Sequence, residues 1–457
     1  MSNISGIYSA LSAMQAQRKV MDVTAHNVAN ASTPGFHRQR VDLVASGSRM
    51  SAGVFAGRGN TYGVDVLGTS RSINIALEAR SVREEGGRSY ATMTSSTMER
   101  IEGIFPEPSD SGIASQLQAF WGSWTDLATN PGGLAPRTAL LQSADTLATS
   151  LHRTANDLQG LANTAIGRVI ELSSNANDVA AQIADLNKKI VGSPESANDL
   201  MDQRELLVTK LSQLTGASSR PADNGQIDVY IGGRAVVSGQ LSFALDGAGG
   251  NLRWALDGQA VNAPSGEAAA LNATITDIVP RYQAALNDMV NTLVTTVNAV
   301  HSVGYDQSST TGRNFFDPAN VTAATISLSV DVAGLPQNIA AGAPVLPGPT
   351  APGVLDGAQA QAIAAIAAGV AGPDNKYRAM VSGLAVEARG ASRRADIQDQ
   401  VADATRAEAD SVGGVSIDEE MANLTASQRA FEAAARVLTA VDQMLDTLIS
   451  RTGLVGR

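Results

Sequence analysis

The sequence contains no cysteine among its 457 residues. Disulfide bonds, thiolate metal sites and cysteine nucleophiles are therefore excluded. Basic residues are also scarce, because 33 lysines and arginines stand against 44 aspartates and glutamates, for a formal net charge of −11. A protein that binds nucleic acid neutralises phosphates with a basic face, so this charge argues against nucleic acid as a partner.

Long apolar runs are missing as well. The sequence has no stretch of about 18 apolar residues, so we predict no membrane-spanning helix. Its first twenty residues, MSNISGIYSALSAMQAQRKV, have neither a basic start nor a continuous apolar segment, and we expect no cleaved signal peptide. Charged residues make up 17% of the chain and aromatic residues 4%, while apolar residues reach 44%. This composition predicts helices packed through small side chains, and the length of 457 residues predicts two to four globular units.

Patterns typical of catalytic and metal sites do not occur in the sequence. Glycines near residue 60 depart from the dinucleotide-binding spacing by one residue and precede a strand-like run, which favours a hairpin. No metalloprotease, phosphate-loop or serine-hydrolase motif is present. The four histidines are His26, His37, His152 and His301. A metal site around the first two is less favoured than surface or packing roles. We therefore expect no enzyme activity, no cofactor and no metal.

A stripe of large apolar side chains runs along the predicted N-terminal helix. Its members follow one another at heptad-like spacing: Ile4, Ile7, Leu11, Met14, Met21 and Val28. This spacing indicates a helix that packs along one side. Asparagines and the Pro34-Gly35 turn end the helix, and residues 36–44 are expected to be extended.

The C-terminus repeats the pattern more strictly. One line of residues recurs every seven positions, namely Ile417, Leu424, Phe431, Leu438 and Leu445. A second line consists of Ala434, Val441 and Leu448. Ser416 and Glu419 form a capping-box start for this helix. Neither terminal helix has a sequence neighbour that would cover its stripe. We therefore predict that the two helices pair in a coiled coil; the alternative is that each packs separately on a globular body.

The middle of the chain divides by composition. Residues 73–215 are predicted to be helical, with breaks near residues 105, 131 and 193, and Trp121 and Trp124 are expected to anchor the core of this part. Short strands with Gly-rich turns follow from residue 216. The predicted fold is mainly α with an inserted β-rich domain, in an elongated multi-domain rod. The domains are residues 1–50 with 412–457 (terminal coiled coil), residues 51–215, 275–303 and 358–411 (helical), and residues 216–274 and 304–357 (outer, β-rich or irregular).

Both ends of the chain resemble the axial proteins of the bacterial flagellum. The stretch ALSAMQAQRKVMDVTAHNVANASTPGF, within residues 9–36, is similar to the N-terminal signature of rod, hook and hook-associated proteins. VSIDEEMANLTASQRAFEAAARVLTAVDQMLDTLI, residues 415–449, is similar to their C-terminal signature. Two internal stretches, DLMDQRELLVTKL and VNAVHSVGYDQSSTTGRNFF, resemble the flagellar hook-associated protein 1 family.

This resemblance implies a structural subunit at the distal end of the hook, which joins hook to filament. The implied partners are copies of the chain in a helical ring, the hook protein, the next hook-associated junction protein and an export chaperone on the C-terminal helix. It also implies an extracellular location reached through the flagellar type III apparatus. The stripe residues of both termini are then the expected assembly interface. Two alternatives remain, namely another axial protein (hook, distal rod or second junction protein) and an axial scaffold with hydrolase activity.

Overall fold

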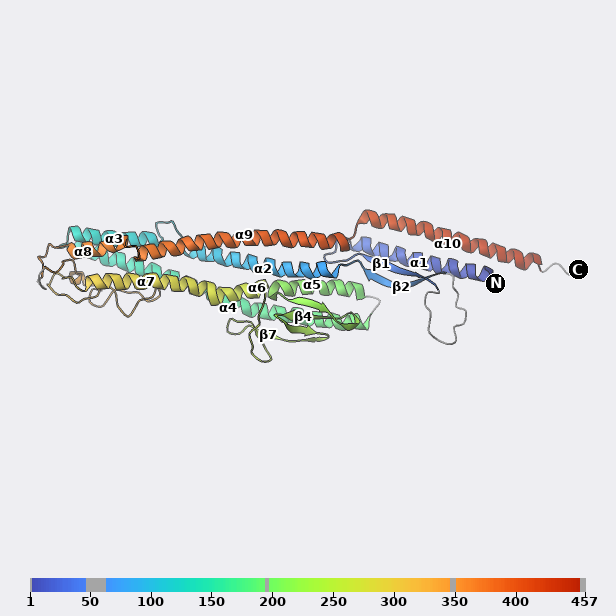
Figure 1. The fold of residues 1–457 in the computed structure, drawn as a ribbon, viewed down its shortest axis with the longest axis horizontal. Coiled ribbons are helices and arrows are strands. Elements are labelled where there is room, and N and C mark those ends of the chain that lie inside the picture. The colour runs from blue at the N-terminus through green and yellow to red at the C-terminus, as the bar shows by residue number, and fades with distance from the viewer. Residues whose placement is uncertain (1, 47–62, 194–196, 346–350, 453–457) are drawn as a thin grey trace. The chain divides into compact units, whose positions relative to one another are not determined.

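The computed structural model describes residues 2–46, 63–193, 197–345 and 351–452. Helices make up most of these residues, and short antiparallel strands are inserted between them (Figure 1). The predicted mainly α fold with inserted β structure is therefore confirmed. Within the described ranges, no helix combines the length and apolar character that a membrane span requires.

The chain forms two compact units. The first contains Met1–Gly87, Asn175–Ala244 and Asp399–Arg457, and the second contains Arg88–Ser174 and Leu245–Gln398. Three of the four divisions fall inside long helices, which are α2 (Ile75–Ile104), α4 (Leu134–Gly192) and α9 (Pro373–Gly413), and the fourth falls between Ala244 and Leu245. The layered domain arrangement expected from the sequence stays a prediction.

The helical region predicted from residue 73 is confirmed together with its breaks. α2 ends just before Phe105 and Pro106, α3 (Ile113–Thr129) ends just before Pro131, and α4 ends at Gly192. Proline lacks the amide hydrogen of a continuing helix and clashes with the preceding turn, so helices end near it. A further helix, α5 (Ala197–Thr215), completes the region.

The first unit combines the chain ends with two small sheets. α1 (Ser2–Asn30) leads into an antiparallel hairpin of β1 (Gln39–Ala45) and β2 (Val64–Arg71), and α10 (Ile417–Thr452) closes the chain. The expected extended run after the Pro34-Gly35 turn is thus β1. A four-stranded antiparallel sheet follows α5 in the order β3 (Ser218–Pro221), β4 (Ile227–Ile231), β5 (Arg234–Ser238) and β6 (Leu241–Ser242).

The second unit is a helical core. Its other elements include β7 (Leu245–Asp246), β8 (Arg253–Trp254), α6 (Gly266–Ala273), a π-helix at Thr274–Ile278, α7 (Val279–His301) and α8 (Ala358–Ala364). Trp124 is fully buried and packs against Phe120 and Phe315, with ring centroids 6.3 and 5.0 Å away. Trp121 is also buried, so the predicted packing role of the tryptophan pair is confirmed.

Polar side chains hold the irregular segment after α7 onto this core. The buried guanidinium of Arg137 donates to the carbonyl oxygens of Pro131, Pro336 and Ile339. His301 is fully buried and accepts a hydrogen bond at Nε2 from the backbone of Ala340, over 2.9 Å. Burial lowers the pKa of His301 to about 4, so this imidazole is neutral and its acceptor nitrogen is available.

Candidate assembly interface

The two ends of the chain meet where α1 lies beside α10 (Figure 1). At one end of the pair, a Cβ on Gly6 would lie 3.6 Å from Cγ2 of Val441. At the other end, Nδ2 of Asn27 donates to Oε2 of Glu420 over 3.0 Å. The two contacts are equally spaced along both helices and follow them in opposite directions. The helices are therefore antiparallel and keep one register along their shared length.

On α10, most of the predicted stripe faces α1. Val441 is buried, and the four residues that share its side of the helix are partly buried, namely Leu424, Phe431, Leu438 and Leu445. The ends of the stripe behave differently, because Ile417 is 52% exposed and Leu448 is 47% exposed. In the observed register Leu448 extends past the start of α1, whereas Ile417 lies opposite Asn30, the last residue of α1.

On α1, the predicted stripe lies beside the contact with α10. Ile7, Met14, Met21 and Val28 are only partly buried, and Leu11 is 42% exposed. The side chain of Ile4 lies outside the described residues. The buried positions are smaller residues on an adjacent face, Ala10, Ala16 and Val23. The observed register sets Phe431 opposite Ala16, so small residues on α1 leave room for the large residues of α10.

A cluster of polar side chains joins the end of α1 to the start of α10. This terminal polar cluster consists of Asn27, Arg38, Gln39 and Glu420. The buried Asn27 accepts from the backbone nitrogen of Gln39 over 3.0 Å and donates to its carbonyl oxygen over 2.8 Å. Arg38 Nε lies 2.8 Å from Oε1 of Glu420, which is 2% exposed. The cluster therefore fixes β1 to both terminal helices at once.

A second cluster fixes the turn after α1 to the rest of the first unit. This His37 cluster consists of His37, Arg71, Glu78, Asp202 and Glu205. His37 Nδ1 lies 2.8 Å from Asp202 Oδ1, and its Nε2 lies 3.3 Å from Glu78 Oε1. Arg71 donates to Asp202 over 2.7 Å and to Glu205 over 2.9 Å.

The charges of the His37 cluster determine the protonation of its imidazole. Burial alone would lower the pKa of His37, but the hydrogen bonds to Asp202 and Glu78 outweigh it and raise the pKa to about 9. His37 is therefore a cation at neutral pH and donates from both ring nitrogens. Ligand atoms of His37, Asp202 and Glu205 lie within 4.8 Å of one another, a spacing that suits a metal ion. The guanidinium of Arg71 already supplies positive charge between the two carboxylates, so the cluster forms an ion-pair network without a metal ion.

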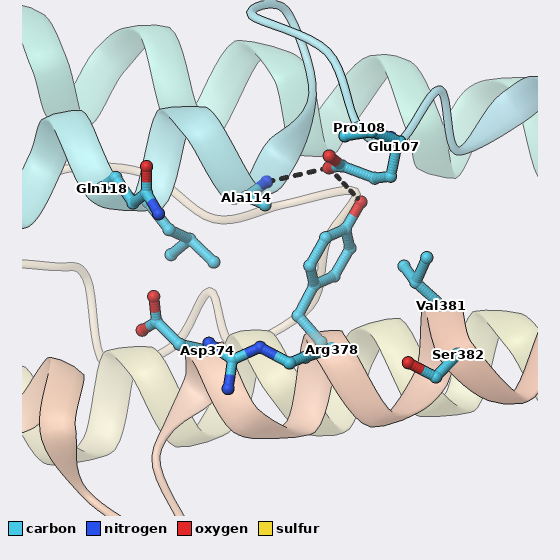
Figure 2. Close-up of a pocket in the computed structure, with 10 residues that line it drawn as sticks. Glu107, Pro108, Ala114, Gln118, Asp374, Arg378, Val381 and Ser382 are labelled. Atoms are coloured by element: carbon cyan, nitrogen blue, oxygen red, sulfur yellow. Dashed lines mark hydrogen bonds between the residues drawn. The ribbon is translucent and has the colours of Figure 1, made fainter.

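The second unit has a pocket of about 260 Å³ between the start of α3 and α9 (Figure 2). Its carboxylates have structural partners. Glu107 accepts from the backbone nitrogen of Ala114 and from the hydroxyl of Tyr377, both over 2.9 Å, and so caps α3. Burial raises the pKa of Asp374, although a hydrogen bond from Trp121 opposes the rise. Both carboxylates are thus held by hydrogen bonds that join α3 and the segment before it to α9.

The sequence stripe thus identified the helix pair, whereas the two polar clusters were not predicted. Their residues do leave a signal, since Asn27 stands in the short stretch that carries the N-terminal resemblance, and His37, Arg38 and Gln39 follow directly after it. Glu420 and Asp202 stand in stretches similar to other parts of the same proteins. The contacts of Asn27 with Glu420 and of His37 with Asp202 join positions more than 150 residues apart in the chain, which local spacing does not reveal.

Family models match three parts of the chain. Residues 98–316 match the model described as the flagellar hook-associated protein FlgK helical domain. Residues 7–37 match the flagella basal body rod protein model, and residues 411–451 match the flagellar basal body rod FlgEFG protein C-terminal model. The two terminal matches therefore contain most of α1 and α10.

Curated relatives agree with these matches. The flagellar hook-associated protein 1 of Bacillus subtilis is 27% identical, and the alignment covers all of both chains. The Salmonella typhimurium protein of the same name is 26% identical over 68% of this chain and 59% of its own length. Among solved structures, the flagellar hook junction protein FlgK from Burkholderia pseudomallei has a TM-score of 0.63 at 15% identity. That likeness covers 72% of this chain and 99% of the other, and concerns the fold.

Proposed function

Because the chain belongs to the flagellar hook-associated protein 1 family, whose members are structural components of the junction between hook and filament, we propose that it builds this junction through its paired terminal helices. The helices pair within one subunit and complete their burial against neighbouring copies. Assembly then follows from the burial of apolar surface, which needs no catalytic group. We accordingly infer no enzyme activity.

The observation that carries the proposal is the apolar surface left open on the helix pair. Leu11 on α1 and Val437 and Met444 on α10 are each at least 42% exposed. Soluble monomers rarely leave contiguous apolar surface open unless another molecule binds there. Each helix of the pair therefore has one side covered inside the subunit and one side available to a neighbour.

The proposal extends to partners and location. We infer that the neighbours are copies of this chain along a ring, the hook protein on one side and the next hook-associated junction protein on the other. We further infer that the subunit is exported without a cleaved signal peptide, bound by a chaperone on its C-terminal helix, and that it acts outside the cell. The resemblance of both termini to axial proteins supports these inferences.

Leu438→Asp tests the proposal. Leu438 faces α1, so an aspartate there places a charge in the contact and opposes pairing. We expect cells with Leu438→Asp as their sole copy to form hooks without filaments in electron micrographs. The purified variant should keep the tryptophan emission of the wild type, because Trp121, Trp124 and Trp254 all belong to the second unit.

Thr439→Asp is the matched control. Thr439 is the next residue along α10 and is exposed, so the same charge there should leave filaments in place. Normal filaments in Leu438→Asp cells would contradict the proposal. If hooks lack filaments in both variants, α10 tolerates no added charge on either side. The proposed role of the α1-facing side would then be contradicted.

A further inference from the structure

One side of α1 is open although it carries large residues. The stripe of Ile7, Leu11, Met14, Met21 and Val28, called here the large stripe, lies about 100° around the helix from the side that faces α10. The hairpin covers another side, since the backbone nitrogen of Val64 donates to Ser12 over 3.2 Å. The large stripe is therefore flanked by covered surface and only partly buried itself.

α10 has an open face of the opposite character. Ala426, Ala430, Ala433, Val437, Ala440 and Met444 are all exposed and form one line along the helix, called here the alanine face. This line also lies about 100° from the side that packs on α1. It is apolar along its length, but four of its six members are alanines, so it is a shallow surface that accepts larger side chains.

The large stripe and the alanine face lie on opposite sides of the helix pair. Val23 of α1, Val41 of β1 and Ala426 of α10 line one groove of about 390 Å³, so the hairpin and the alanine face share a side. On α1, the large stripe points away from Val23, because the two directions differ by roughly half a turn. Two surfaces that face opposite ways on one subunit cannot meet each other within it.

We propose that the large stripe of α1 packs onto the alanine face of α10 in a second copy of this chain, an inference that rests on the proposed function and assigns its two contact surfaces. The fit repeats the one inside the subunit, where large residues of α10 lie over small residues of α1. Because the two surfaces differ and face opposite ways, the contact is heterologous and repeats from copy to copy in one direction. The groove beside Ala426 continues the alanine face and gives the incoming helix a wall.

Engineered disulfides test this contact, and the absence of native cysteine makes the experiment clean. Leu11→Cys is combined with Ala433→Cys or with Val437→Cys on the alanine face. The matched control combines Leu11→Cys with Thr439→Cys, which is also exposed but points away from that face. Each variant is the sole copy in cells, and isolated hook–filament structures are oxidised and run on a non-reducing gel.

We expect a ladder of dimers and larger species from at least one alanine-face pair, and none from the Thr439 pair or from single-cysteine variants. Disulfides need Cα atoms within about 7 Å, so a ladder reports direct packing between copies. An equal ladder from the Thr439 pair, or no ladder in structures that contain the protein, would overturn the inference. Failure of the proposed function would look different, because the protein would then be missing from the isolated junctions altogether.

Discussion

Replacing Asn27 by alanine should weaken the pairing of α1 with α10 by removing the hydrogen bonds of one side chain. The Asn27 side chain makes three hydrogen bonds, two with the backbone of Gln39 and one with Glu420. Gln39 is buried, so its amide and carbonyl would lose their partners without gaining water. Each unsatisfied buried group costs about 1–3 kcal/mol, while Glu420 keeps its ion pair with Arg38. We expect the pairing of α1 with α10 to lose about 3 kcal/mol, which is roughly a hundredfold in its equilibrium constant.

The assay is co-sedimentation of purified subunit with hooks isolated from cells that lack this protein. The Asn27→Ala variant should need roughly a hundredfold higher concentration for half-saturation, while its tryptophan emission stays unchanged. Asn423→Ala is the control, because Asn423 is exposed on α10 and lines the same groove without joining the polar cluster. Equal binding by Asn27→Ala and wild type would refute the reasoning that these hydrogen bonds hold the ends together.

Three further substitutions test interactions that stabilise other parts of the fold. The folded-state pKa of His37, about 9, exceeds its ordinary value of 6.5, so its contribution is complete below pH 6.5 and lost as pH rises through 9. Urea unfolding followed by circular dichroism should therefore show His37→Gln less stable by about 3 kcal/mol at pH 6 and equal to wild type at pH 10. Arg137→Met should lower the melting temperature of the second unit, read from tryptophan emission, by about 5–10 °C, because three carbonyls lose their donor. Gly35→Ala should destabilise the first unit in urea by about 1–3 kcal/mol, because Gly35 has φ 74° and a Cβ there would lie 2.7 Å from Cγ of Leu206.

Arg137→Met has a matched control, and a contrary result can be stated for each of the other two changes. Arg153→Met removes an exposed arginine from the same helix as Arg137 and should leave the melting temperature unchanged. A pH-independent difference between wild type and His37→Gln would show that the imidazole charge does not stabilise the fold. A Gly35→Ala variant as stable as wild type would show that the turn relaxes without cost.

The sequence predicted the helix pair but not the face that α1 uses in it. On α10 the residues that face α1 are leucines, phenylalanine and valine, so apolar spacing located the correct side. On α1 the facing residues include Gly6, Ala10 and Ala16, which carry little apolar signal, while larger residues stand on the adjacent side. Spacing records where large apolar residues recur and does not record which partner covers them.

The polar clusters show a second limit of sequence reasoning. Asn27 and Glu420 look like ordinary helix residues until the fold brings them within 3.0 Å. Their value depends on burial, which is a property of the packed structure. The breaks between helices, by contrast, follow from proline and glycine at the break itself, and for that reason they were predicted from the sequence.

The hydrogen bond between Asn27 and Glu420 affects how uniformly α1 and α10 align in different subunits. A heptad pattern alone allows two helices to shift by one repeat and still bury similar surface. A buried polar residue disfavours this shift, because it would lose its hydrogen-bond partner on the other helix. The Asn27–Glu420 hydrogen bond therefore favours one alignment of the paired helices. A regular assembly requires subunits of the same conformation. The hydrogen bond from the Asn27 amide to Glu420, 393 residues away in the chain, favours that single conformation.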